Sequence, residues 1–159
     1  MKLSPRSLHG MADRHSASRI EGDTLHLAMV NEAGSVQAGQ ADLRAFLGGQ
    51  GITGSGGFQA ELAFEELVMN VLQHAYAGVP QGQAAITACV VAGDTQIVVT
   101  IEDSGRPFDP VRSPEWPLPA SREQATPGGL GIRFVRASAA RITHQRAGDT
   151  NRTTVWVDR

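Results

Sequence analysis

Three segments in a fixed order constrain the fold of this chain more than any other feature. They are ELAFEELVMNVLQHAY at 61–76, EDSGRPFDP at 102–110 and PGGLGIRFV at 127–135. Taken singly, each has a common explanation: a solvated helix face, a turn, or a flexible hinge before a helix. Their joint order predicts a helix, an acidic strand end and a glycine-rich helix start arranged around one nucleotide pocket.

The segment 61–76 is the clearest element of the chain. Glycine and proline at Gly78 and Pro80 end the predicted helix. Glu66 and Asn70 share a face beside the buried stripe, and His74 lies one turn further along. A carboxylate and an amide at this spacing suit Mg²⁺, and a carboxylate near a metal-bound phosphate can accept a proton. The predicted buried stripe consists of Leu67, Val68, Val71, Leu72 and Ala75.

Asp103 lies where the alternating pattern of the strand predicted at 95–103 stops, and Gly105 follows it. A carboxylate in this place can accept a hydrogen bond from an exocyclic amine, and a glycine lets a flat ring approach the backbone. The alternative is a tight turn, for which Asp-Ser-Gly is common chemistry.

The glycine-rich turn precedes a short helix predicted at 129–139. Free backbone amides and the dipole at a helix N-terminus attract phosphate. The alternative is a hinge, since the chain holds 18 glycines. The phosphate interpretation rests on Gly128, Gly129 and Gly131.

The remaining pattern predicts an α+β two-layer sandwich, with helices on one face of a mixed, mainly antiparallel sheet. Residues 1–20 are expected to be a flexible leader, and residues 21–159 a single domain with a lid loop at 104–128. Residues 48–57 are expected to form a glycine-rich linker. The other predicted elements are a strand at 24–30, a helix from about 35 to 47, and strands at 84–91, 141–146 and 152–157.

Composition narrows the function classes. A formal net charge of -2 argues against a dedicated nucleic-acid binder. No apolar run approaches the roughly 20 residues of a membrane span, and the cytoplasm is the expected location. Lys2 is the one lysine, which excludes a lysine-based phosphate loop. Cys89 is the one cysteine, which excludes an internal disulfide, and we expect it in the core.

These segments resemble the boxes of the Bergerat-type ATP-binding fold shared by gyrase, Hsp90, histidine kinases and MutL. The resemblance is closest to the anti-sigma-factor serine/threonine kinase branch, of the RsbW and SpoIIAB type. EELVMNVLQHAY resembles the N-box, DSGRPFDP the first glycine box and GGLGI the second, while NRTTV fits the closing hairpin. The resemblance covers about residues 24–157.

The resemblance implies a role for each matching residue. Glu66 would be the general base and Asn70 the magnesium ligand. Asp103 would bind the adenine amine, with Gly105 beneath the ring, and Thr154 would support the adenine side through water. The turn at Gly128, with Gly129, Leu130 and Gly131, would present amides to the phosphates. Further phosphate-side residues would be His74, Arg106 and Arg133.

The same resemblance implies ATP and Mg²⁺ as cofactors and a partner-switching serine/threonine kinase as the function. Its acceptor would be an anti-anti-sigma antagonist of the STAS type, and a sigma factor would be a second partner. Two alternatives stay open: a non-catalytic ATP-binding module that sequesters its partner, and a simple ATPase. Homodimer and monomer also stay open. The chain has no room for a phosphorylated helical hairpin, which excludes a complete sensor kinase, and we expect neither nucleic acid nor membrane as partner.

Overall fold

The computed structural model describes residues 16–112 and 129–159. Their strands form one six-stranded sheet in the order β1-β2-β3-β4-β6-β5, and every neighbouring pair is antiparallel. No parallel pair occurs among the described strands, so the expected mixed character is absent there. The strands are β1 (Ser16–Glu21), β2 (Thr24–Val30), β3 (Ala85–Ala92), β4 (Gln96–Asp103), β5 (Arg141–Ala147) and β6 (Thr150–Asp158).

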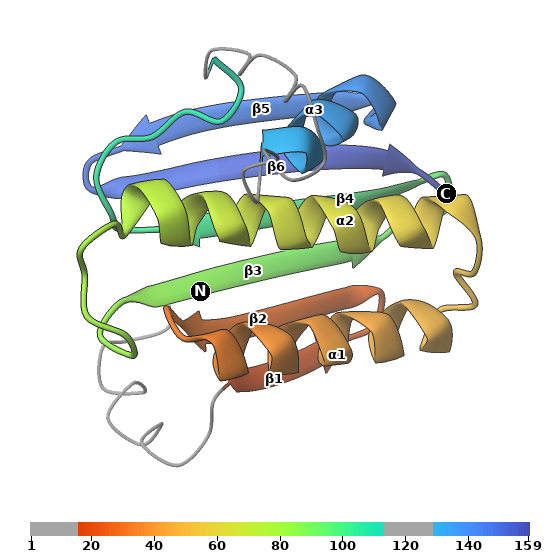
Figure 1. The fold of residues 1–159 in the computed structure, drawn as a ribbon. Coiled ribbons are helices and arrows are strands. Elements are labelled where there is room, and N and C mark those ends of the chain that lie inside the picture. Colours follow the sequence, from red (N-terminus) through yellow and green to blue (C-terminus); the bar gives the residue numbers. More distant parts are fainter. Residues whose placement is uncertain (1–15, 113–128) are drawn as a thin grey trace.

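Three α-helices cover one face of this sheet (Figure 1). The first, α1 (Ala33–Gly49), packs on β1 and β2, while α2 (Ser55–Asn70) packs on β4 and β6. The third, α3 (Gly129–Ser138), packs beside α2. The predicted two-layer α+β sandwich with helices on one face is confirmed.

The core lies between α1, α2 and the inner face of the sheet. On β4 the inner residues Ile97, Val99 and Ile101 are at most 2% exposed, as expected from the period of two along a strand. Phe64 of α2 is fully buried in the same hydrophobic cluster. Truncation of a buried phenylalanine to alanine typically costs about 3–5 kcal/mol, so this side chain is a main support of the sandwich.

The first strand corrects the expected leader. Residues 16–20 belong to β1, which pairs with β2 from Ser16 opposite Met29 to Glu21 opposite Thr24. Side chains along β1 are mostly exposed, so the strand carries no apolar alternation and forms through backbone pairing at the sheet edge. Residues 1–15 of the leader, and residues 113–128 of the lid, lie outside the described residues.

The glycine-rich linker is shorter than predicted. Helix α1 runs to Gly49 and α2 begins at Ser55, so Gly56 and Gly57 are helical and buried. A Cβ at Gly56 would lie 2.6 Å from the carbonyl oxygen of Asp158. These glycines therefore allow the first turn of α2 to approach the end of β6, a purpose that composition alone does not reveal.

Helix α2 continues into a π-helical turn, η2 (Val71–Ala75). Such turns are rare and often lie at functional sites. Its end is fixed by Tyr76, whose hydroxyl donates to the carbonyl oxygen of Ala85 at 2.6 Å and accepts from the amide of Ser104 at 3.0 Å. The turn thereby connects α2 to the end of β4.

Two smaller observations concern the sheet surface and the helices. Cys89 lies on the uncovered face of the sheet and is half-buried, because its neighbours Ala88 and Val90 take the inner positions of β3. The expectation of a core cysteine is therefore wrong. Among the described residues, the helices are too short or too polar to span a bilayer.

Candidate functional site

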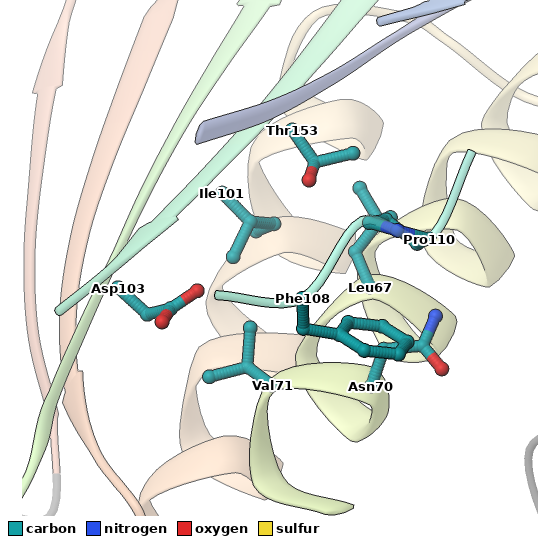
Figure 2. A pocket seen from close by; sticks show the side chains of 8 residues that line it. All are labelled: Leu67, Asn70, Val71, Ile101, Asp103, Phe108, Pro110 and Thr153. Carbon is teal, nitrogen blue, oxygen red and sulfur yellow. The ribbon is translucent and has the colours of Figure 1, made fainter. Parts of the chain in front are cut away.

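A small cavity lies between α2 and the inner face of the sheet (Figure 2). Its volume is about 10 Å³, which is room for about one water molecule. A nucleotide can therefore enter only if part of the wall moves. The walls come from α2 with η2, from β4 and β6, and from the segment after β4, through Leu67, Asn70, Val71, Ile101, Asp103, Phe108, Pro110 and Thr153.

The segment after β4 closes the cavity from outside. The ring of Phe108 stacks on His74 of η2 at 4.3 Å between centroids, with 16° between the planes. The carbonyl oxygen of Pro110 accepts a hydrogen bond from the guanidinium of Arg136 on α3. The predicted lid is thus, in its described part, held against both η2 and α3.

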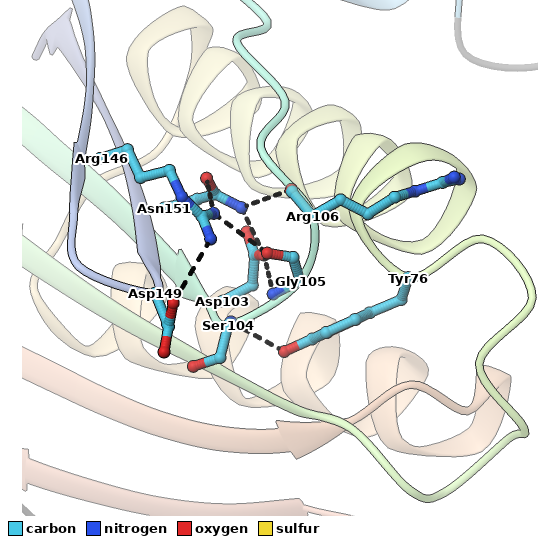
Figure 3. A network of polar contacts seen from close by, with 8 residues as sticks. All are labelled: Tyr76, Asp103, Ser104, Gly105, Arg106, Arg146, Asp149 and Asn151. Atoms are coloured by element: carbon cyan, nitrogen blue, oxygen red, sulfur yellow. Dashed lines mark hydrogen bonds and ion pairs between the residues drawn. The ribbon is translucent and has the colours of Figure 1, made fainter.

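The last residue of β4 forms the polar wall. Asp103 is 6% exposed, and its Oδ1 accepts from the amide of Gly105 and from Nδ2 of Asn151, both at 2.8 Å. Arg146 of β5 donates to Oδ1 of Asn151 at 2.7 Å and to the carbonyl oxygen of Gly105 at 3.0 Å (Figure 3). We call the network of Asp103, Gly105, Arg146 and Asn151 the sheet end of the cavity; Asp103 is its member that lines the wall, and the other three lie behind it.

The backbone of Gly105 packs closely against η2. A Cβ at this position would lie 2.5 Å from the carbonyl oxygen of Ala75. The same carbonyl accepts the amide of Arg106 at 3.0 Å. Gly105 therefore permits the turn after β4 to pack on η2, and it is absent from the cavity wall described above.

On α2 the predicted pair Glu66 and Asn70 lies one turn apart beneath α3. Asn70 is 5% exposed and lines the cavity. Its Nδ2 and the Oε2 of Glu66 are buried without a hydrogen-bond partner among the described residues. Burial, with a smaller contribution from the neighbouring Glu65 carboxylate, raises the pKa of Glu66 to about 7.

The start of α3 lies directly on Glu66. A Cβ at Gly131 would overlap the carboxylate of Glu66, so a side chain there would force that carboxylate to move. Gly129 and Leu130 form the first turn of α3, where backbone amides have no partner within the helix. Gly128 lies outside the described residues. We call Glu66, Asn70 and the first turn of α3 the helix end of the cavity.

Two of the weaker site predictions, His74 and Arg106, lie at the rim. His74 faces Phe108, and its pKa is lowered by burial and by the nearby Arg106 guanidinium. The exposed Arg106 donates from Nε to the carbonyl oxygen of His74 at 3.2 Å. Neither residue lines the cavity in its closed form, and Arg133 also lies away from its wall, on α3.

Thr154 lies on the wrong face for its predicted role. Its hydroxyl lies 3.1 Å from that of Thr100 on the uncovered side of the sheet. Thr153 lines the cavity instead, with its hydroxyl 2.9 Å from Nδ1 of His144. Side chains alternate along a strand, so an error of one residue moved the expected contact to the opposite face.

Sequence reasoning also missed Asn151 and Arg146. Asn151 occupies an inner position of β6, in line with Thr153, Val155 and Val157, which are all buried. That alternation was readable in the sequence and would have placed both Asn151 and Thr153 toward the core. Arg146 offers no such signal, because its contact depends on the register of the β5–β6 hairpin.

Comparisons with known proteins identify the family to which this chain belongs. The family model described as "Histidine kinase-like ATPase domain" matches residues 29–158. The chain belongs to this family. A curated relative, the serine/threonine-protein kinase BtrW of Bordetella bronchiseptica, is 30% identical over 98 residues, which are 62% of this chain and 68% of that protein. These two matches confirm the predicted resemblance to the anti-sigma-factor serine/threonine kinase branch.

Among solved structures, the histidine kinase domain from the Erythrobacter litoralis EL346 blue-light activated histidine kinase matches with a TM-score of 0.43 and 20% identity. The match covers 77% of this chain, and the chain spans 60% of that structure's length.

A histidine kinase-like ATPase domain binds ATP, and the helix end suits the accompanying Mg²⁺. No cluster of three or more His, Cys, Asp or Glu side chains occurs in residues 16–112 and 129–159. Mg²⁺ bound to a nucleotide needs only one or two protein ligands, because phosphates and waters supply the rest. A half-turn of the Asn70 amide would bring its Oδ1 to the place of the unpartnered Nδ2. Asn70, with Glu66 beside it, therefore fits a metal that arrives with its substrate.

Proposed function

We propose that this chain is an ATP-dependent protein serine/threonine kinase of the anti-sigma-factor type. Its acceptor would be an anti-anti-sigma antagonist of the STAS type, in a cytoplasmic partner-switching system that also includes a sigma factor. Family membership and the match to a serine/threonine kinase support ATP binding and phosphotransfer. A homodimer is compatible with this proposal but is not needed for it.

The observation that carries the step from binding to transfer is the state of Glu66. Its carboxyl is half-buried, has one oxygen without a partner among the described residues, and lies against the first turn of α3. A pKa of about 7 lets it exist as carboxylate and as acid near neutral pH. Such a group can take a proton in one step and release it afterwards.

In the proposed reaction, Glu66 accepts the proton of the antagonist's serine hydroxyl while the serine oxygen bonds to the γ-phosphorus. The bond from the γ-phosphorus to its bridging oxygen breaks, and ADP leaves. The amides of the first turn of α3 would hold the phosphates. Asn70 would hold Mg²⁺, which supplies charge neutralisation for the transferred group.

The test is phosphotransfer from labelled ATP to a STAS-domain protein encoded in the same genome. We expect phosphoserine with the wild type and a transfer rate about 10²–10⁴-fold lower with Glu66→Gln. ATP affinity should stay within about threefold, since the isosteric amide leaves the sheet end intact. Glu61→Gln on the same helix, which removes only an ion pair with Arg44, is the control. Equal transfer by Glu66→Gln, or none by the wild type, would overturn the kinase.

One observation favours the non-catalytic alternative. Because the closed cavity holds about one water, a nucleotide has to displace the segment of Phe108 and Pro110. By that displacement, nucleotide binding to this chain would change its affinity for a sigma factor without any phosphotransfer. ATP binding that changes sigma-factor affinity equally in wild type and Glu66→Gln would support this alternative. Phosphate release without antagonist would support a simple ATPase.

A further inference from the structure

Asn151 has no role in the proposed chemistry, yet it is among the most completely bonded side chains of the site. It is 2% exposed and lies opposite Asp103 in the β4–β6 register. Its Nδ2 donates to Oδ1 of Asp103 at 2.8 Å and to the carbonyl oxygen of Arg106 at 3.0 Å. Its Oδ1 accepts from Nη1 of Arg146 at 2.7 Å (Figure 3).

These partners allow only one orientation of the amide. A guanidinium can only donate hydrogen bonds, whereas a carboxylate and a carbonyl can only accept them. A half-turn of Asn151 would set its NH₂ group against Arg146 and its oxygen against Asp103. Three hydrogen bonds would then be lost in a buried place, where unpaired polar groups are costly. Arg146 thus fixes Asn151 as a donor toward Asp103.

Because the Asn151 donor is fixed, the two oxygens of Asp103 have different hydrogen-bonding roles. Oδ1 accepts from both Asn151 and the amide of Gly105, which uses its two lone pairs. In the described part of the chain, all hydrogen bonds to this carboxylate go to Oδ1. Oδ2 is therefore the oxygen left to accept from a ligand, and the carboxylate cannot rotate to offer it elsewhere without breaking the other two bonds.

We propose that Asn151, oriented by Arg146, is a positioning residue that fixes Asp103 as a one-oxygen acceptor and so selects purines with an amino group at position 6. This inference rests on the proposed ATP binding. A 6-amino group donates to Oδ2, a 6-oxo group sets one acceptor against another, and a purine without a 6-substituent makes no contact. The selectivity then depends on a residue that does not touch the base.

The test compares the affinities of ATP and purine riboside 5′-triphosphate, which lacks the 6-amino group, by calorimetry with the full chain. We expect the wild type to prefer ATP by about tenfold or more, as for a hydrogen bond to a charged group. Asn151→Ala should lower this preference about tenfold while leaving the affinity for the analogue within about threefold. Arg146→Met, which keeps the apolar stem of the side chain, should lower this preference about threefold.

The control is Arg152→Met. Arg152 is the next residue along β6, but it points to the uncovered face, where it pairs with Glu102. Its preference for ATP should equal that of the wild type. If Asn151 had a purely structural role, Asn151→Ala would lower the affinities for both nucleotides equally. An unchanged preference for ATP in both Asn151→Ala and Arg146→Met would overturn this inference alone. No ATP binding by the wild type would overturn the proposed function as well.

Discussion

The two ends of the cavity are built in opposite ways. At the sheet end, Asp103 and Asn151 are buried with hydrogen bonds to one another and to neighbouring groups. At the helix end, Glu66 and Asn70 each bury a polar atom without a partner among the described residues. Unpaired buried polar groups cost free energy, so a protein keeps them mainly where a ligand or a reaction will use them.

Under the proposed function, this difference separates ligand recognition at the sheet end from phosphotransfer at the helix end. An end whose carboxylate is held through one oxygen by fixed donors is rigid and can distinguish ligands by what they offer to the other oxygen. An end with unsatisfied atoms can bind a cation or move a proton when its substrate arrives. Four predictions test the comparison.

The largest expected effect is at the sheet end. Asp103→Asn replaces an acceptor by a group that can turn a donor toward the ligand amine, and it removes a charge-assisted hydrogen bond. We expect ATP affinity to fall about 100-fold, measured by calorimetry. Glu102→Gln, on the adjacent residue of β4 but on the opposite face, should bind ATP as the wild type does. Unchanged affinity of Asp103→Asn would place the nucleotide elsewhere.

A second effect concerns the close packing of the sheet end. Gly105→Ala sets a Cβ against the backbone of Ala75. We expect the free energy of unfolding in urea to fall by about 1–3 kcal/mol, as for other overpacked sites. Gly48→Ala in α1, where nothing lies within 4 Å, should be neutral or slightly stabilising. Equal stability of Gly105→Ala would mean that the turn after β4 is looser than described.

At the helix end, the pH dependence of the free energy of unfolding should reveal the raised pKa of the Glu66 carboxyl. The pKa of Glu66 is about 7 in the folded protein and 4.5 as its ordinary value. The folded state therefore binds the Glu66 proton more tightly than the unfolded state does. The stability that this proton contributes is complete below pH 4.5 and is lost as the pH rises through 7. Glu66→Gln should remove a loss of about 1–2 kcal/mol across this window, after allowance for nearby solvent.

Urea unfolding of wild type and Glu66→Gln from pH 4.5 to 8 measures this loss, and Glu61→Gln is the matched control. Parallel stability profiles of wild type and Glu66→Gln would show that the carboxyl is not strained. The comparison between the two ends would then lose its basis.

The smallest effect lies at the closure between the two ends. Phe108→Ala removes the ring stacked on His74, a contact worth about 0.5–1.5 kcal/mol. We expect ATP to associate about two- to tenfold faster in stopped-flow measurements, because the cavity opens more often. Phe58→Ala, at the exposed start of α2, serves as control. An unchanged rate would show that closure by Phe108 does not limit entry.

The sequence predicted the sandwich because the strong patterns coincide with the core. The helical period of α2 and the alternation of β4 both mark faces that are buried here. It also predicted that Glu66, Asn70, Asp103 and Gly131 converge, since ordered boxes place helix and strand ends together. It missed β1, whose exposed side chains leave no pattern, and the helical role of Gly56. The alternation along β6 could have placed Asn151 toward the core, whereas the contact of Arg146 depends on the register of the β5–β6 hairpin and left no signal in the sequence.

The bond between Asn151 and Asp103 joins residues 48 positions apart, and β6, which carries Asn151, is the last strand of the sheet in chain order. During synthesis, β4 leaves the ribosome well before the strand that completes its polar end. The hydrogen bond between Asn151 and Asp103 can therefore form only after β6 has emerged. A chain truncated before β6 would hold both glycine boxes yet lack the amide that orients the Asp103 carboxylate.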